Sequence, residues 1–117
     1  MESNPSAVAD AKANAALNGI ANTEFYSGQV EVLLPSLLAL GAETVIVDPP
    51  RAGLLPKTME ALMAGCPRNL LYVSCNPVSL GRDLAALSGA YRVERAEVFD
   101  LFPHTEHVET AVMLQRN

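Results

Sequence analysis

The chain has 117 residues, of which half are apolar and 18% are charged, and it carries a formal net charge of −5. This composition excludes a disordered or collagen-like chain and favours one globular domain, or part of one. A membrane span requires about 20 apolar residues, and no uncharged stretch of this chain is that long. Two cysteines are too few for a disulfide framework. We therefore expect a cytoplasmic protein with reduced thiols and no membrane contact.

The charge distribution limits the nucleic-acid binding that this chain can support alone. Its 13 acidic residues outnumber its 8 Lys and Arg, and the basic residues form no continuous block. Clustered cations supply most of the affinity of proteins for phosphate backbones, so the composition disfavours an autonomous nucleic-acid binder. If RNA is a substrate, regions outside this chain must supply much of the grip on it.

Helical and strand patterns alternate along the chain, which predicts an α/β layer structure. Asn4 followed by Pro5 is typical of a helix start, and Asn18 followed by Gly19 is typical of its end. Beyond this first helix we expect, in chain order, a short strand at 23–27, a helix at 29–40, a strand at 44–47, a helix at 57–64, a strand at 69–74, a helix at 78–87, and strands at 91–99 and 109–115. The β-branched run at 44–47 is typical of a strand that is buried on both faces.

The two closing strands have no helix between them. Their connection, residues 100–108, is shorter than the crossover of about a dozen residues that a parallel pair needs, so we expect an antiparallel hairpin. The sheet as a whole should be mixed and mostly parallel. A doubly wound unit ordinarily starts with a strand and a phosphate-binding turn, whereas this chain starts with a helix. We therefore expect the N-terminal strands of the fold to be missing.

Three polar clusters follow or join the predicted strands. Residues 48–53 follow the strand at 44–47, residues 74–77 follow the strand at 69–74, and residues 102–109 connect the closing strands. Ligands in open α/β sheets bind outside the carboxyl ends of the strands. We expect all three clusters to open onto the same edge of the sheet.

Cys75 lies between a predicted strand and a predicted helix, with Asn76 as N-cap and Pro77 at the first helical position. The backbone N–H groups of a helix start stabilise a thiolate, so this placement would activate Cys75 as a nucleophile. The alternative is an inert core cysteine, because cysteine is among the most buried residue types. Cys66, between a helix and a strand, lacks these neighbours and is interpreted as structural.

Asp48 and Arg51 form the second group of candidates. Asp48 could accept a hydrogen bond from a ligand amine or base, and the prolines after it make the loop rigid. Arg51 could hold a phosphate or a carboxylate. Each residue also has a simpler interpretation, since an aspartate ahead of proline is common in turns and a lone arginine is most often a solvated surface charge.

The cluster at 102–109 contains two histidines and two glutamates. His104 and His107 lack the i, i+4 spacing of helical zinc ligands, so we do not expect a metal site. Glu109 begins an otherwise apolar strand, and a carboxylate that enters a buried strand at the edge of a site is a candidate general base. The simpler interpretation is a hydrated glutamate at a strand end.

Taken together, Asp-Pro-Pro-Arg-Ala-Gly-Leu at 48–54, Tyr-Val-Ser-Cys-Asn-Pro at 72–77 and Phe-Pro-His-Thr-Glu-His-Val-Glu at 102–109 resemble the RNA (uracil-5-)-methyltransferase family in order and spacing. The resemblance implies a Rossmann-like methyltransferase fold and an S-adenosylmethionine-dependent enzyme that methylates carbon 5 of uridine in rRNA or tRNA. It covers essentially the whole chain. Residues 1–117 would form the C-terminal part of a single catalytic domain.

The resemblance implies two catalytic residues. Cys75 would attack carbon 6 of a uridine that has left its stack, and Glu109 would be the general base that removes the carbon-5 proton. Glu106 matches the position of that base less well. Carbon 5 of uracil is a weak nucleophile until a thiolate adds at carbon 6, so the chemistry needs both groups.

The resemblance also implies binding residues. Glu2 ahead of the first helix, Gln29 and Asp48 stand where the family contacts S-adenosylmethionine, although the family more often has Asn or Asp in place of Gln29. We assign Arg51 and His104 to substrate contacts. RNA is the expected partner, and single-stranded or loop uridines are the expected targets because the base must enter a pocket.

The chain departs from the family in lacking the Gly-rich loop and strand that cradle the cofactor, and the N-terminal RNA-binding regions. It could be a piece of a longer protein, a split enzyme completed by another chain, or a rearranged fold that exchanges elements in a dimer. Its unpaired strand edges could also support self-association. We favour the first explanation, because the missing part would carry the basic RNA-binding surface.

Three other functions fit some of these residues. Asp-Pro-Pro followed by an aromatic residue marks adenine amino-methylation, but Arg51 stands in the aromatic position. A Cys-His hydrolase could combine Cys75 with His104 or His107 and an acidic residue. A non-catalytic α/β module could bind a partner chain along an exposed strand edge.

Overall fold

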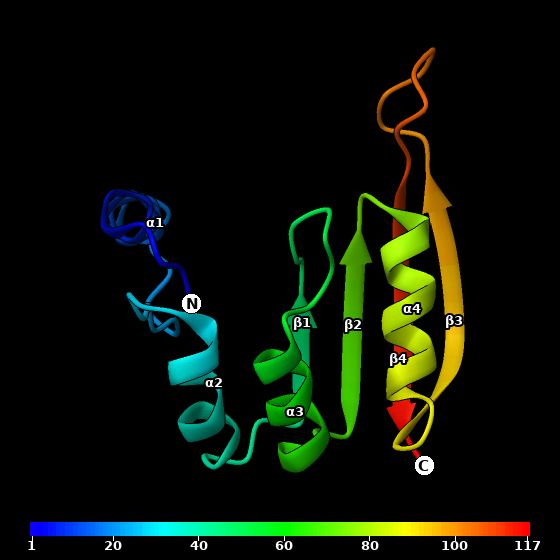
Figure 1. The fold of residues 1–117 in the computed structure, drawn as a ribbon. Coiled ribbons are helices and arrows are strands. Elements are labelled where there is room, and N and C mark those ends of the chain that lie inside the picture. Colours follow the sequence, from blue (N-terminus) through cyan, green and yellow to red (C-terminus); the bar gives the residue numbers. More distant parts are fainter.

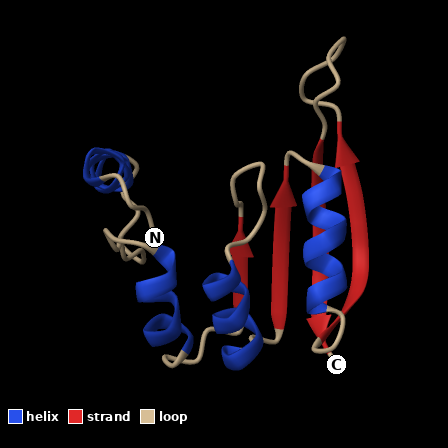
Figure 2. Ribbon diagram, in the orientation of Figure 1, coloured by secondary structure: helices blue, strands red, loops and turns tan.

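The computed structural model describes residues 1–117 and contains four helices and four strands (Figures 1 and 2). No helix combines the length and the apolar composition that crossing a membrane requires. In chain order the elements are α1 (Pro5–Leu17), α2 (Val30–Leu38), β1 (Thr44–Val47), α3 (Pro56–Gly65), β2 (Asn69–Ser74), α4 (Pro77–Leu87), β3 (Tyr91–Phe99) and β4 (Glu109–Arg116).

The four strands form one sheet in the order β1-β2-β4-β3. β1 and β2 pair in parallel, whereas β4 is antiparallel to both of its neighbours. Three strands therefore point in one direction and β4 points against them (Figure 1), which confirms the mixed, mostly parallel sheet with a closing hairpin. Hydrophobic patterns do not specify which strands become neighbours, and the insertion of β4 between β2 and β3 is visible only in the structure.

One face of the sheet is covered by α3 and α4 (Figure 2). Residues of β2 alternate between half-buried and buried, as expected for a strand with one covered face. α2 packs against α3 outside the β1 edge, and α1 lies farther from the sheet. The core side chains are Leu34, Leu38, Leu62, Leu70, Tyr72, Leu80, Leu87, Tyr91, Val112 and Leu114.

The opposite face of the sheet carries apolar side chains that remain open to solvent. Leu71 of β2 pairs with Ile46 on one side and with Met113 on the other, so the three side chains share this face. Ile46 is 67% exposed and Met113 is 36% exposed. These apolar side chains lie in the middle of the open face and not at the carboxyl edge of the sheet.

Two expectations about strands are wrong. Residues 23–27 form no strand, because their backbone is not joined to the sheet: Ser27 makes a single bridge with Glu2, and the Glu2 amide donates to the carbonyl of Tyr26 at 3.1 Å. Strand β1 is not buried on both faces, since it forms a sheet edge and Ile46 projects from the open face.

Candidate active site

The three polar clusters meet at one edge of the sheet, as the sequence predicts. The loop after β1, the turn after β2 and the β3–β4 connection all lie at this edge (Figure 1). Two contacts join them: Asn76 Nδ2 donates to the carbonyl of Arg51 at 2.9 Å, and Arg51 Nη1 lies 3.4 Å from His107 Nδ1. Segments far apart in the chain therefore form one candidate site.

Cys75 occupies the single position between the last residue of β2 and the N-cap of α4. Ser74 Oγ accepts from the Asn76 amide at 3.1 Å, and the Asn76 side chain accepts from the Val78 amide at 3.1 Å. Ser79 Oγ donates to the Asn76 carbonyl at 3.1 Å. The backbone on the C-terminal side of Cys75 is thus fixed by hydrogen bonds, while its thiol is half-buried rather than sealed in the core.

Glu109 begins β4, the strand that neighbours β2. In the antiparallel register Val73 faces Ala111 and Ser74 faces Thr110. Cys75 and Glu109 are the next residues beyond this last pair, one directly after β2 and the other at the start of β4. The topology therefore places the predicted nucleophile and the predicted base at the same end of two neighbouring strands, and Glu109, like Cys75, is half-buried.

The two histidines of the β3–β4 connection occupy different places. His107 is half-buried and contacts Arg51, whereas His104 is exposed, with left-handed backbone at φ 68°, on the projecting part of the connection. Thr105 Oγ1 donates to the Phe102 carbonyl at 2.7 Å and accepts from the His107 amide at 3.2 Å. Neither histidine hydrogen-bonds to Cys75, so the arrangement gives a Cys-His hydrolase no support.

The three residues predicted to hold the cofactor are exposed and come from separate segments. The bridge between Glu2 and Ser27 brings Glu2 near Gln29, whose side chain makes no capping bond at the start of α2. The Asn4 amide donates to the Glu2 carboxylate at 2.7 Å, and this bond holds the pKa of Glu2 below its ordinary value. Asp48 directly follows β1. Carboxylate and amide oxygens of this kind fit the hydroxyl and amino groups of a nucleoside cofactor.

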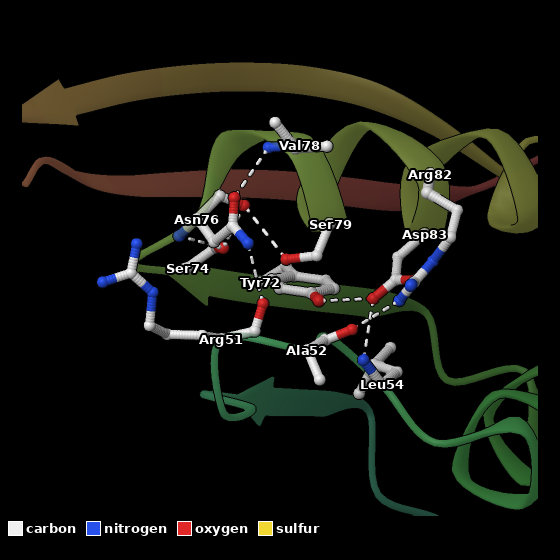
Figure 3. Close-up of polar contacts among 10 residues, drawn as sticks. All are labelled: Arg51, Ala52, Leu54, Tyr72, Ser74, Asn76, Val78, Ser79, Arg82 and Asp83. Atoms are coloured by element: carbon white, nitrogen blue, oxygen red, sulfur yellow. Dashed lines mark hydrogen bonds and ion pairs between the residues drawn. The ribbon is translucent and has the colours of Figure 1, made fainter.

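A buried carboxylate that the sequence did not reveal lies behind the site. Asp83 of α4 is only 2% exposed, and its Oδ2 accepts from Tyr72 Oη at 2.6 Å and from the Leu54 amide at 2.8 Å. Arg82 pairs with Asp83 Oδ1 at 2.7 Å and donates to the Ala52 carbonyl at 2.7 Å (Figure 3). We call these contacts the Asp83 anchor.

The anchor determines the ionisation of its members. Burial raises the pKa of Asp83, but the hydrogen bonds from Tyr72 and Leu54 and the Arg82 guanidinium outweigh that effect, so its pKa lies below the ordinary value. Burial, followed by the bond to the Asp83 carboxylate, raises the pKa of Tyr72 well above that of a free tyrosine. Tyr72 therefore donates its proton to a charged Asp83.

No group of three or more His, Cys, Asp or Glu side chains is arranged to hold a metal ion. Two surface hollows lie away from the three clusters. One is bordered by α1 and residues 20–26, and the other lies between α2 and α3.

A sequence model of the tRNA (uracil-5-)-methyltransferase family matches residues 31–117, which is well over half of the chain. The chain belongs to this family. Membership in the tRNA (uracil-5-)-methyltransferase family confirms the resemblance carried by the three motifs and identifies the chain as methyltransferase sequence. It also agrees with the observed architecture, in which the three motifs lie at the carboxyl edge of an α/β sheet.

Individual relatives and a solved structure support the same conclusion. The chain is 45% identical over 118 residues to an uncharacterized RNA methyltransferase of Porphyromonas gingivalis, and 44% identical over 114 residues to one of Bacillus cereus. These matches cover 97% and 96% of this chain and 25% of each relative. The chain thus spans about a quarter of the length of the curated relatives it matches.

The solved structure is that of Pyrococcus abyssi tRNA (uracil-54, C5)-methyltransferase in complex with S-adenosyl-L-homocysteine. It superposes with a TM-score of 0.82 and 38% sequence identity, over 96% of this chain and 27% of that chain. The match confirms a Rossmann-like methyltransferase fold for this chain. S-adenosyl-L-homocysteine is the product that S-adenosylmethionine leaves after methyl transfer, so the bound ligand agrees with the expected cofactor of the family.

Proposed function

We propose that this chain is the C-terminal part of the catalytic domain of an enzyme that methylates carbon 5 of uridine in tRNA or rRNA. One observation supports the proposal: the β2–β4 pairing ends at Ser74 opposite Thr110, so Cys75 directly after β2 and Glu109 at the start of β4 lie at the edge where all three motifs meet. Substitution at carbon 5 requires a nucleophile and a base at the same site. The fold, the family and the relatives named above support an RNA methyltransferase but leave the position of the methyl group open.

In the proposed mechanism Cys75 acts first. Its sulfur forms a bond to carbon 6 of uracil, and the electron pair of the carbon 5–carbon 6 double bond moves toward carbon 5 and the neighbouring carbonyl oxygen. Carbon 5 becomes nucleophilic by this addition. S-adenosylmethionine would supply the methyl group that carbon 5 takes up. Glu2, Gln29 and Asp48 are the residues that would hold this cofactor.

Glu109 acts last. It removes the proton from carbon 5, the electron pair re-forms the double bond, and Cys75 leaves as a thiolate. Arg51, which stands beside His107 at the same edge, would bind a phosphate of the RNA. His104 remains a proposed substrate contact on the projecting β3–β4 connection. The uridine must leave its stack to reach Cys75, and much of the grip on RNA would come from regions outside this chain.

The test uses a hybrid enzyme in which this chain replaces the matching quarter of the Porphyromonas gingivalis relative. The hybrid is incubated with S-adenosylmethionine and with tRNA or rRNA transcripts that contain 5-fluorouridine. Fluorine cannot leave as a proton does, so the Cys75 adduct should persist and be seen as a slower band in a denaturing gel. Cys75→Ala should abolish the adduct, whereas the matched control Cys66→Ala should keep it.

The same hybrid tests Glu109 with ordinary uridine RNA. Glu109→Gln should trap the methylated adduct, because the carbon-5 proton can no longer be removed, and Glu106→Gln should turn over like the unchanged hybrid. An adduct that survives Cys75→Ala would remove Cys75 from the mechanism. Normal turnover by Glu109→Gln would do the same for Glu109.

A further inference from the structure

The Asp83 anchor joins two functional segments through a helix that itself carries no predicted site residue. On α4, Asp83 is a charged side chain with almost no solvent exposure. Burying a carboxylate is costly unless hydrogen bonds and an opposite charge compensate it. Here the compensation comes from Tyr72 behind it, from Arg82 beside it, and from the Leu54 amide of the loop that follows β1.

The loop is built to receive this carboxylate. Gly53 is buried and has left-handed backbone at φ +85°, and a Cβ atom at this position would lie 2.5 Å from both Asp83 Oδ2 and Arg82 Nη2. Only glycine tolerates that backbone conformation and that close approach together. Gly53 therefore allows the loop to pack closely against α4.

The same loop is held again beside Cys75. The Arg51 carbonyl accepts from Asn76 Nδ2 at 2.9 Å, and the Ala52 carbonyl accepts from Arg82 at 2.7 Å (Figure 3). Three backbone groups of the loop, the carbonyls of Arg51 and Ala52 and the amide of Leu54, are therefore hydrogen-bonded to α4 or to its N-cap residue. The loop carries Asp48 and Arg51, and the cap directly follows Cys75.

We propose that Asp83 is a positioning residue, which holds the loop bearing Asp48 and Arg51 in register with the turn bearing Cys75. The inference rests on the proposed function, in which that loop serves the cofactor and the substrate while Cys75 serves the reaction. Rigid support of this kind keeps reacting groups in productive geometry, and small displacements reduce the rate strongly. A carboxylate that only stabilised the fold would have no selective effect on the loop or on Cys75.

The experiment approaches the anchor from both sides. Asp83→Asn removes the charge from α4, and Gly53→Ala places a methyl group against the anchor from the loop. Gly81→Ala is the matched control, because Gly81 also lies near the anchor in sequence but a Cβ atom there meets no neighbour within 4 Å. In the 117-residue chain we would measure amide hydrogen exchange of residues 51–54 and the rates at which iodoacetamide alkylates Cys75 and Cys66.

Both anchor variants should exchange the amides of residues 51–54 about tenfold faster than the unchanged chain, which is the signature of local opening. Both should raise the alkylation rate of Cys75 while that of Cys66 stays the same. The double variant should add little to either single change, because both substitutions break the same contacts. The Gly81→Ala control should behave like the unchanged chain.

The proposal is overturned if the loop amides of both variants exchange as in the unchanged chain, or if all amides and both cysteines change together, which would indicate general destabilisation. In the hybrid enzyme, Asp83→Asn should lower kcat for methylation and leave the KM for RNA within about twofold. An unchanged kcat there would also refute it. A hybrid without methylation activity would instead contradict the proposed function, while the exchange and alkylation results would still decide whether the anchor exists.

Discussion

Asp83 shows how the environment of one residue decides its role. A carboxylate near the middle of an amphipathic helix is ordinarily a solvated charge, and nothing in the local sequence distinguishes Asp83 from that case. In the fold it receives hydrogen bonds from β2, from α4 and from the loop after β1. Its charge is therefore part of the native structure, and the stability of the chain should depend on keeping it.

The pKa of Asp83 lies below its ordinary value, and this gives a pH dependence of known sign. Its contribution to stability is complete above the ordinary aspartate pKa of about 3.9 and is lost as the pH falls through the lower folded-state pKa. Asp83→Asn should cost about 2–4 kcal/mol at pH 7, and the difference from the unchanged chain should shrink at pH 3. Urea unfolding at both pH values, followed by circular dichroism, measures this; a difference that grows on acidification would contradict it.

Sequence and structure agree best on residues whose signals are local. Cys75 and Glu109 follow or begin strands that hydrophobic patterns define, and the structure brings them to the same edge. His107, rather than His104, makes the contact with Arg51, and His104 is exposed on the β3–β4 connection. The Asp83 anchor could not be predicted from the sequence, because its members are separated in the chain and come into contact only when β2, α4 and the loop pack together.

At the scale of elements, α1 and α4 provide a direct comparison, because both begin with Asn followed by Pro. Asn4 accepts from the Ser6 amide at 3.0 Å and Asn76 from the Val78 amide at 3.1 Å, so each side chain caps its helix. Only Asn76 also donates to a distant segment, at the carbonyl of Arg51. The same Asn-Pro motif therefore caps a helix in α1, whereas in α4 it caps the helix and also holds the loop after β1.

This difference predicts unequal effects of the same substitution. Asn4→Ala should cost about 1 kcal/mol, the usual loss of an N-cap. Asn76→Ala should cost about 2 kcal/mol, because it also leaves the Arg51 carbonyl without its donor. Urea unfolding of the two variants under identical conditions compares them. Equal losses would show that the contact with Arg51 contributes nothing to stability.

The ends of the helices and strands can be predicted from the local sequence, whereas the pairing and burial of the strands cannot. Strands β1, β2 and β3 occupy the predicted ranges, and the predicted helices are displaced by one or two residues at their ends. The failures at 23–27 and at β1 have one cause. Residues 23–27 have the composition of a short strand and β1 that of a buried one, but a strand forms, and is covered, only where neighbouring elements are present to pair with it and pack against it.

At the scale of the whole molecule, the two edges of the sheet differ in chemistry. The β3 edge carries alternating charges, with ion pairs between Arg92 and Glu94 and between Arg95 and Glu97. The β1 edge has the uncharged sequence Thr-Val-Ile-Val, and Ile46 stands exposed on the open face beside it. Charged edges resist pairing with other strands, and uncharged β-branched edges invite it. We therefore predict that another polypeptide would add to this sheet at the β1 edge.

We predict that the isolated chain self-associates through the β1 edge and that a single charge prevents it. Ile46→Lys should keep the average mass at 12.5 kDa as the protein concentration rises, whereas the mass of the unchanged chain should increase. Val98→Lys is the matched control, because Val98 is equally exposed at 67% but lies on the β3 edge. It should associate like the unchanged chain. Sedimentation equilibrium distinguishes the variants, and equal suppression by both lysines would place the contact elsewhere and attribute the effect to net charge alone.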